Sequence, residues 1–164
     1  MNNISLIGMP ACGKSTVGVL LAKTLNMAFT DTDLLIQQAC GKFLWQILED
    51  DGNDGFNRKE EAVIGALRCE NTCIATGGSA VYSEKAMNHL KSISRIIFLH
   101  VPVEEIIART GDIKSRGVVI EKGKTLEELY DERLPLYKKY AGITVNAGGK
   151  SLEKVVYEIS CLFL

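Results

Sequence analysis

The chain has 164 residues, 46% of them hydrophobic and 24% charged, which suits one globular domain with its own apolar core. The net charge of −1 excludes a polybasic surface for nucleic acid or for an anionic membrane. The five cysteines are odd in number and scattered, so they predict reduced thiols and argue against a disulfide framework or a zinc site.

Apolar runs alternate with amphipathic segments along the chain, the pattern of a parallel sheet covered by helices on both faces. We expect strands at residues 3–7, 28–30, 72–75, 95–100 and 143–145. We expect helices at residues 15–25, 32–40, 44–50, 55–68, 83–90, 103–109, 126–140 and 152–164. These elements predict an α/β fold with a five-stranded parallel sheet, in a single domain over residues 1–164.

The first strand leads into residues 8–16, Gly-Met-Pro-Ala-Cys-Gly-Lys-Ser-Thr, which fit the phosphate-binding pattern G-x-x-x-x-G-K-[ST]. Two glycines let backbone N–H groups wrap around a β-phosphate, Lys14 brings a charge to the β/γ-phosphates, and the Ser15 hydroxyl can ligate Mg²⁺. The alternative is a glycine-rich turn, but a strand before and a helix after favour a nucleoside triphosphate and a P-loop kinase fold. The predicted nucleotide-binding residues here are Gly8, Ala11, Cys12, Gly13, Lys14, Ser15 and Thr16.

Two carboxylates follow the second strand, in the sequence Asp31-Thr32-Asp33. Loops after parallel strands meet at the edge of the sheet where ligands bind, so these carboxylates are expected near the P-loop. One can reach the Mg²⁺ shell beside Ser15, and the other can accept a proton or hydrogen bond from an acceptor hydroxyl. A helix cap is the alternative role.

The region between the second and third strands is longer than a simple crossover needs. We interpret residues 33–61 as a segment that binds the acceptor. Within it, Trp45 and Ile47 are expected to share an apolar helix face in the core.

Glycines follow the third strand as well, in the sequence Gly77-Gly78-Ser79. Paired glycines allow backbone N–H groups to approach an anionic or polyhydroxylated ligand, although a plain tight turn is an equal alternative.

Residues 111–124 are polar, rich in glycine and weakly periodic, which is typical of a lid that excludes water from a phosphoryl transferase. Arg116 in this segment can cover the phosphates as charge develops, and Arg109 just before it can stack on adenine. Arg133, on the following helix, has the planar fork that suits a substrate carboxylate. Each of these arginines is an ordinary surface residue unless a family pattern supports it.

Taken together, these motifs resemble those of the shikimate kinase family almost end to end. The resemblance is carried by residues 8–16, Asp31-Thr32-Asp33, residues 52–61, Thr76 to Ala80, Arg109-Thr110-Gly111, Arg116 and Arg133-Leu134-Pro135-Leu136-Tyr137. It implies transfer of the ATP γ-phosphoryl group to the 3-hydroxyl of shikimate.

The resemblance also implies a role for each of these residues. Lys14, Ser15 and Asp31 would serve ATP and Mg²⁺, with Arg109 and Lys150 also at the nucleotide. Lys14, Asp33 and Arg116 would be catalytic, with Arg116 on the transferring phosphoryl group. The implied acceptor-binding residues are Asp33, Asn57, Arg58, Gly77, Gly78, Ser79 and Arg133.

Three positions differ from the family pattern. Asn57 stands where F-R-x-x-E has its arginine, with Arg58 one residue later and about 100° around the helix, while Glu60 is retained. Ser79 replaces the third glycine of G-G-G, and Gly117 replaces the proline of the lid's R-P.

Because two of these positions belong to the acceptor pocket, a related kinase for another polyol or hydroxy acid is one alternative. A nucleotide-binding regulator without turnover is another. The N-terminal residues resemble no secretory leader, and no apolar run reaches the ~18 residues of a membrane span. We therefore expect a cytoplasmic monomer that acts on a small molecule.

Overall fold

The computed structural model describes residues 2–110 and 118–164 of the chain. Five parallel strands form one sheet in the order β2-β3-β1-β4-β5. They are β1 (Asn3–Ile7), β2 (Ala28–Asp31), β3 (Thr72–Ala75), β4 (Ser94–His100) and β5 (Ile143–Asn146). Central β1 pairs Leu6 with Ala75 of β3 on one side and with Ile97 of β4 on the other. All the strands point the same way, so the loops that follow them gather at one edge of the sheet.

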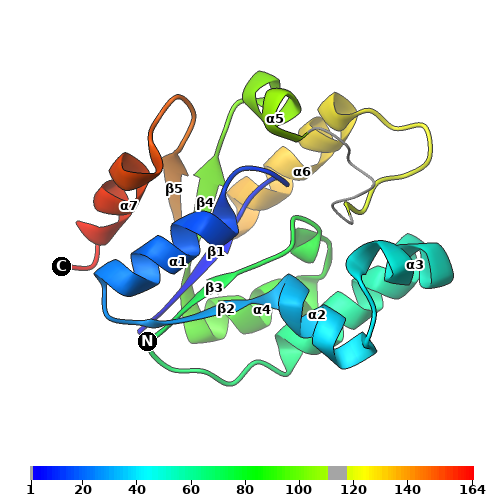
Figure 1. Cartoon of the computed structure of the whole chain (residues 1–164), viewed down its shortest axis with the longest axis horizontal. Helices are drawn as coiled ribbons and strands as arrows, with labels where there is room; N and C mark the ends of the chain where they lie inside the picture. The colour runs from blue at the N-terminus through cyan, green and yellow to red at the C-terminus, as the bar shows by residue number, and fades with distance from the viewer. Residues whose placement is uncertain (1, 111–117) are drawn as a thin grey trace.

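Helices cover both faces of this sheet (Figure 1). They are α1 (Lys14–Thr24), α2 (Thr32–Cys40), α3 (Leu44–Gly65), α4 (Glu84–Ile93), α5 (Val103–Thr110), α6 (Leu126–Tyr140) and α7 (Leu152–Ser160), with a 3₁₀ turn η1 (Ala80–Tyr82). Helices α1 and α7 pack together on one face, and α4 and α6 lie on the other. Helices α2 and α3 pack on each other beside the end of β2. Strands β1 and β3 are buried along their whole length, as central strands of a sheet covered on both faces are.

The predicted α/β fold with a five-stranded parallel sheet is confirmed, and the boundaries differ in a few places. The helices expected at 44–50 and 55–68 form one element, α3, which is kinked at Gly52 with φ 66° and ψ −177°. The last helix ends at Ser160 instead of residue 164, and the 3₁₀ turn η1 was not expected.

The expectation that Trp45 lies in the core is wrong. Ile47 is fully buried, whereas Trp45 is 43% exposed. Residues two apart on a helix point in nearly opposite directions, so a helix that buries Ile47 turns Trp45 outward.

Buried Asn3 connects the start of the central strand to its neighbours. Its Nδ2 donates to the carbonyls of Cys69 at 2.8 Å and Ile93 at 3.0 Å, and its Oδ1 accepts from the N–H of Thr72 at 2.9 Å. The side chain therefore satisfies three backbone groups at the start of β3 and the end of α4.

All five cysteines are free thiols. In the part of the chain that the structure describes, no helix combines the length and the apolar character needed to cross a membrane.

Replacing Asn3 with alanine should lower the free energy of unfolding by about 3 kcal/mol, because it leaves buried backbone groups without partners. Denaturant unfolding of the variant measures this loss. Asn88→Ala, at an exposed position of α4, is the matched control and should change stability by less than about 0.5 kcal/mol. Equal stability of the two variants would contradict the role given to Asn3.

Candidate active site

The P-loop joins the end of β1 to the start of α1. Its last residue, Gly13, has φ 99°, a left-handed conformation that glycine adopts without strain. This turn directs the first N–H groups of α1 toward the space above the sheet, where they can bind an anion. The Lys14 side chain curls back over the loop, and its Nζ donates to the carbonyls of Gly8 and Met9 at 2.8 Å each.

Ser15 and Asp31 meet beside the loop. The Ser15 hydroxyl donates to Oδ2 of Asp31 at 2.5 Å, and Oδ1 of Asp31 accepts from the N–H of Asp33 at 2.9 Å. Asp31 therefore caps α2, the alternative role given to it above, and also accepts a hydrogen bond from the hydroxyl at the start of α1. A hydroxyl and a carboxylate in contact are an oxygen pair of the kind that Mg²⁺ binds beside phosphates.

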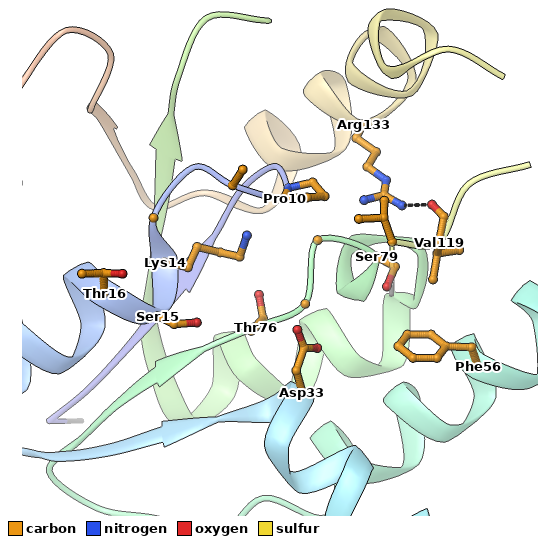
Figure 2. A pocket seen from close by; sticks show the side chains of 15 residues that line it. Pro10, Lys14, Ser15, Thr16, Asp33, Phe56, Thr76, Ser79, Val119 and Arg133 are labelled. Atoms are coloured by element: carbon orange, nitrogen blue, oxygen red, sulfur yellow. Dashed lines mark hydrogen bonds between the residues drawn. The ribbon is translucent and has the colours of Figure 1, made fainter. Parts of the chain in front are cut away.

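A cavity of about 350 Å³ opens above the P-loop (Figure 2). It is lined by Pro10, Ala11, Gly13, Lys14, Ser15, Thr16, Asp33, Phe56, Thr76, Gly77, Gly78, Ser79, Val118, Val119 and Arg133. Figure 2 shows Lys14 and Ser15 on one side of the cavity and Arg133 and Val119 on the other. Asp33 lies between Ser15 and Phe56 in this view. The phosphate-binding loop and the predicted acceptor residues thus share one cavity.

Two carboxyl groups converge beside this cavity. Burial raises the pKa of Asp33 to about 6, helped by the charge of Asp31 and opposed by Lys14. Burial likewise raises the pKa of Glu60 to about 7, opposed first by its hydrogen bond from Ser79. Both groups face Gly77: a Cβ atom at that position would lie less than 3.0 Å from Glu60 Oε1 and from Asp33 Oδ1. Only glycine allows the two carboxyl groups to approach the turn in this way.

The turn after β3 is held by side chains from three other elements. The N–H of Gly77 donates to Oγ1 of Thr32 at 3.2 Å, and the carbonyl of Gly78 accepts from the Tyr137 hydroxyl at 2.8 Å. The Ser79 hydroxyl donates to Oε2 of Glu60 at 2.6 Å.

Arg133 is 1% exposed and is fixed by two hydrogen bonds. Its Nε donates to the Tyr82 hydroxyl at 3.1 Å, and its Nη2 donates to the Val119 carbonyl at 2.6 Å. The remaining nitrogen, Nη1, lies beside Gly78 at the cavity. No acidic side chain of residues 2–110 or 118–164 forms an ion pair with this guanidinium, so it can receive an anion from outside.

Two other predicted nucleotide residues lie near the loop or beyond it. Arg109 reaches the P-loop, because its Nη1 donates to the Ala11 carbonyl at 3.4 Å while the guanidinium also pairs with Glu105. Lys150 follows β5 and pairs with Glu158 at 2.6 Å. Arg116 lies outside the described residues.

The two predicted acceptor residues of α3 do not line the main cavity. Asn57 borders a separate depression with Tyr82 and Val119, and its buried Oδ1 receives no hydrogen bond from the described residues. Arg58 is exposed and borders a different depression, which Asp51 also lines. The structure therefore does not bring Arg58 to Arg133.

Sequence reasoning assigned no role to Tyr82 or to Glu60. The family pattern marked Glu60 as retained but gave it no role, although an acid four residues after Phe56 falls on the same helix face as this buried aromatic residue. Tyr82 lies in a short 3₁₀ turn with no periodic pattern, and its contact with Arg133 spans 51 positions.

Comparison with known proteins identifies the family. The family model described as shikimate kinase matches residues 10–162. The chain belongs to the shikimate kinase family. It is 38% identical over 162 residues to the shikimate kinase of Pseudomonas paraeruginosa, covering 97% of this chain and 94% of the relative. It is 35% identical to that of Francisella tularensis subsp. novicida, covering 96% and 92%.

Solved structures agree with this assignment. The shikimate kinase of Acinetobacter baumannii in complex with shikimate superposes with a TM-score of 0.89 at 29% identity, covering 99% of this chain and 93% of that one. The enzyme from Aquifex aeolicus gives 0.85 at 36% identity, covering 98% and 95%. Members of this family are phosphotransferases that use ATP and an alcohol acceptor.

Replacing Gly77 with alanine should lower the free energy of unfolding by about 1–3 kcal/mol, because the methyl group would meet two carboxyl oxygens. Gly65→Ala is the matched control: nothing lies within 4 Å of its Cβ position, so we expect a gain of about 0.5–1 kcal/mol from helix propensity. Thermal unfolding of both variants measures the difference. A Gly77→Ala protein as stable as the wild type would show that the turn or the carboxyl groups shift freely.

Proposed function

We propose that this chain transfers the γ-phosphoryl group of ATP to the 3-hydroxyl of shikimate, giving shikimate 3-phosphate. The observation that carries the proposal is the shared cavity, in which the P-loop Lys14, the carboxylate of Asp33 and the guanidinium of Arg133 line the same space. A donor phosphate, an acceptor hydroxyl and an acceptor carboxylate each find a matching group there. Family membership supports the same reaction.

In this proposal the loop residues hold the nucleotide. Gly8, Ala11, Cys12, Gly13 and Thr16 supply the backbone around the phosphates, and Lys14 supplies the charge that stabilises the transferring group. Ser15 and Asp31 would hold Mg²⁺, which neutralises phosphate charge when bound. Arg109 and Lys150 would lie toward the adenosine end.

The acceptor residues lie on the other side of the cavity. Asp33 would accept a hydrogen bond from the acceptor hydroxyl and receive its proton, for which a raised pKa near the working pH is suited. Arg133 would bind the carboxylate through Nη1. Gly77, Gly78 and Ser79 would border the ring, while Asn57 and Arg58, although implied by the family pattern, would need to move to reach it.

Residues 111–124 would close over the cavity as a lid. Residues 118–120 of this segment contact the site. The Val119 carbonyl accepts a hydrogen bond from Arg133, and Asn53 Nδ2 donates to the Ile120 carbonyl at 3.2 Å. Arg116 would act from this lid on the transferring phosphoryl group. We further propose a single domain that works as a cytoplasmic monomer, with residues 33–61 binding the acceptor.

The uncharged Asn57 favours one alternative acceptor, a polyol or hydroxy acid that needs a single cationic partner. A regulator without turnover is a weaker alternative, since Lys14, Ser15, Asp31 and Asp33 are all in place around the cavity.

An ADP-release assay over hydroxylated carboxylic acids and neutral sugars tests the proposal. Shikimate should give the highest kcat/KM, because Arg133 discriminates in favour of a carboxylate. Lys14→Ala should lower kcat at least about 10²-fold through lost charge stabilisation, while Lys23→Ala, on the exposed end of α1, should leave it unchanged. A neutral sugar as the best substrate, or full activity of a folded Lys14→Ala protein, would overturn the assignment.

Replacing Asn57 with arginine should lower the KM for shikimate by at least about tenfold, a difference of ~1.4 kcal/mol. The physical reason is that asparagine donates hydrogen bonds but cannot neutralise a carboxylate. Steady-state kinetics with saturating ATP measure the change, and Asn88→Arg, at an exposed position of α4 outside the cavity, serves as the control. An unchanged KM would show that Arg133 suffices for the carboxylate.

A further inference from the structure

Glu60 is a buried acid that forms no ion pair with any cation of residues 2–110 or 118–164. It is 2% exposed, and its only hydrogen bond among residues 2–110 and 118–164 comes from the Ser79 hydroxyl to Oε2. Its other oxygen, Oε1, is buried and receives no hydrogen bond from the part of the chain that the structure describes, and it lies against Gly77 together with Oδ1 of Asp33. An ionised carboxylate accepts hydrogen bonds on both oxygens, whereas a neutral acid carries its own proton on one of them.

The charged groups around Glu60 do not form a compensating ion pair with it. Lys14 projects from α1 and donates to the carbonyls of Gly8 and Met9, and Arg133 projects from α6 and donates to Tyr82 and Val119. Asp33, from α2, adds a negative charge that opposes ionisation of Glu60. The surroundings therefore favour the neutral acid, because a buried charge without a partner is costly.

A substrate carboxylate at Arg133 would add a further negative charge to this small, partly dry space. Arg133 already influences Glu60 electrostatically, so an anion bound to this guanidinium would cancel part of the attraction that stabilises ionised Glu60. The neutral form of Glu60 is then favoured more strongly in the complex than in the free protein.

We propose that the acceptor site binds its carboxylate substrate with Glu60 as a neutral acid hydrogen-bonded to Ser79, so that binding takes up a proton whenever Glu60 is ionised. Glu60 is thus a positioning residue that couples acceptor affinity to pH. This inference rests on the proposed function, since it requires an acceptor with a carboxylate.

Ser79 sets the pH at which the coupling appears. Its hydroxyl donates to Glu60 and so stabilises the ionised form, which lowers the pKa of this acid relative to an apolar neighbour. Removing the hydroxyl should keep Glu60 neutral to a higher pH.

Calorimetric titration of the full chain with shikimate, in the absence of ATP, tests the proposal. Between pH 6.5 and pH 8.5 the wild-type affinity should fall by about tenfold or more, because the pKa of Glu60 lies near 7 and only the neutral form binds tightly. At pH 8, titrations in two buffers of different ionisation enthalpy should show uptake of close to one proton for each shikimate bound.

Three variants separate this coupling from a structural role. Glu60→Gln, which is neutral at every pH, should bind shikimate with little pH dependence and without proton uptake. Ser79→Ala should retain proton uptake and shift the loss of affinity to higher pH. Glu61→Gln is the matched control, because Glu61 also accepts a 2.6 Å hydrogen bond from a serine, Ser83, but lies outside the cavity and pairs with Lys85. It should behave as the wild type.

The outcomes distinguish this inference from the proposed function. Tight wild-type binding with no pH dependence and no proton uptake would overturn the role of Glu60 and leave shikimate as the acceptor. Proton uptake that persists in Glu60→Gln would assign the proton to another group and equally overturn it. Absence of shikimate binding at every pH would overturn both proposals.

Discussion

The site depends on the backbone pairing of β1 with strands on both of its edges. Because β1 lies between β3 and β4 in parallel register, the P-loop leaves the sheet directly beside the turn at Gly77. Strand β2 pairs with the far edge of β3 and delivers Asp31 and Asp33 next to that turn. The buried side chain of Asn3 fixes the start of the same strands. A one-residue shift in this pairing would turn alternate side chains to the other face and separate the groups that line the cavity.

Two cationic and two acidic side chains lie in or beside the cavity. Lys14 and Arg133 approach from α1 and α6, while Asp33 and Glu60 approach from α2 and α3. Low exposure strengthens every interaction among them, and it raises the pKa of both acids. Each charged group is therefore sensitive to the state of the others. Arg133 also connects these charged groups to Tyr82 and to Val119 through its hydrogen bonds.

Local sequence patterns predicted the parts of the fold and of the site in which each motif adjoins its own strand. The P-loop directly follows β1, and Asp31 and Asp33 lie at the end of β2, so parallel strands place both motifs at the same edge of the sheet. Which side chains of a helix face the cavity or the core depends on their position around the helix axis, and this was harder to predict. Arg58 does not line the cavity because it lies two residues beyond Phe56, which does, and Trp45 is exposed because it lies two residues before the buried Ile47. The contact of Ser79 with Glu60 spans 19 positions and links separate elements, so no local pattern announces it.

The two hydrogen bonds of Lys14 to its own loop have a consequence for ligand discrimination. Because two backbone carbonyls hold the ammonium group, part of the cost in side-chain freedom falls on folding instead of on binding. An incoming anion must also compete with two carbonyl oxygens that the ammonium already contacts. A singly charged anion gains little from that exchange, whereas a chain of phosphates, with several negative oxygens in reach of the loop N–H groups, gains much more. The contacts of Lys14 with its own loop therefore favour polyphosphates over singly charged anions.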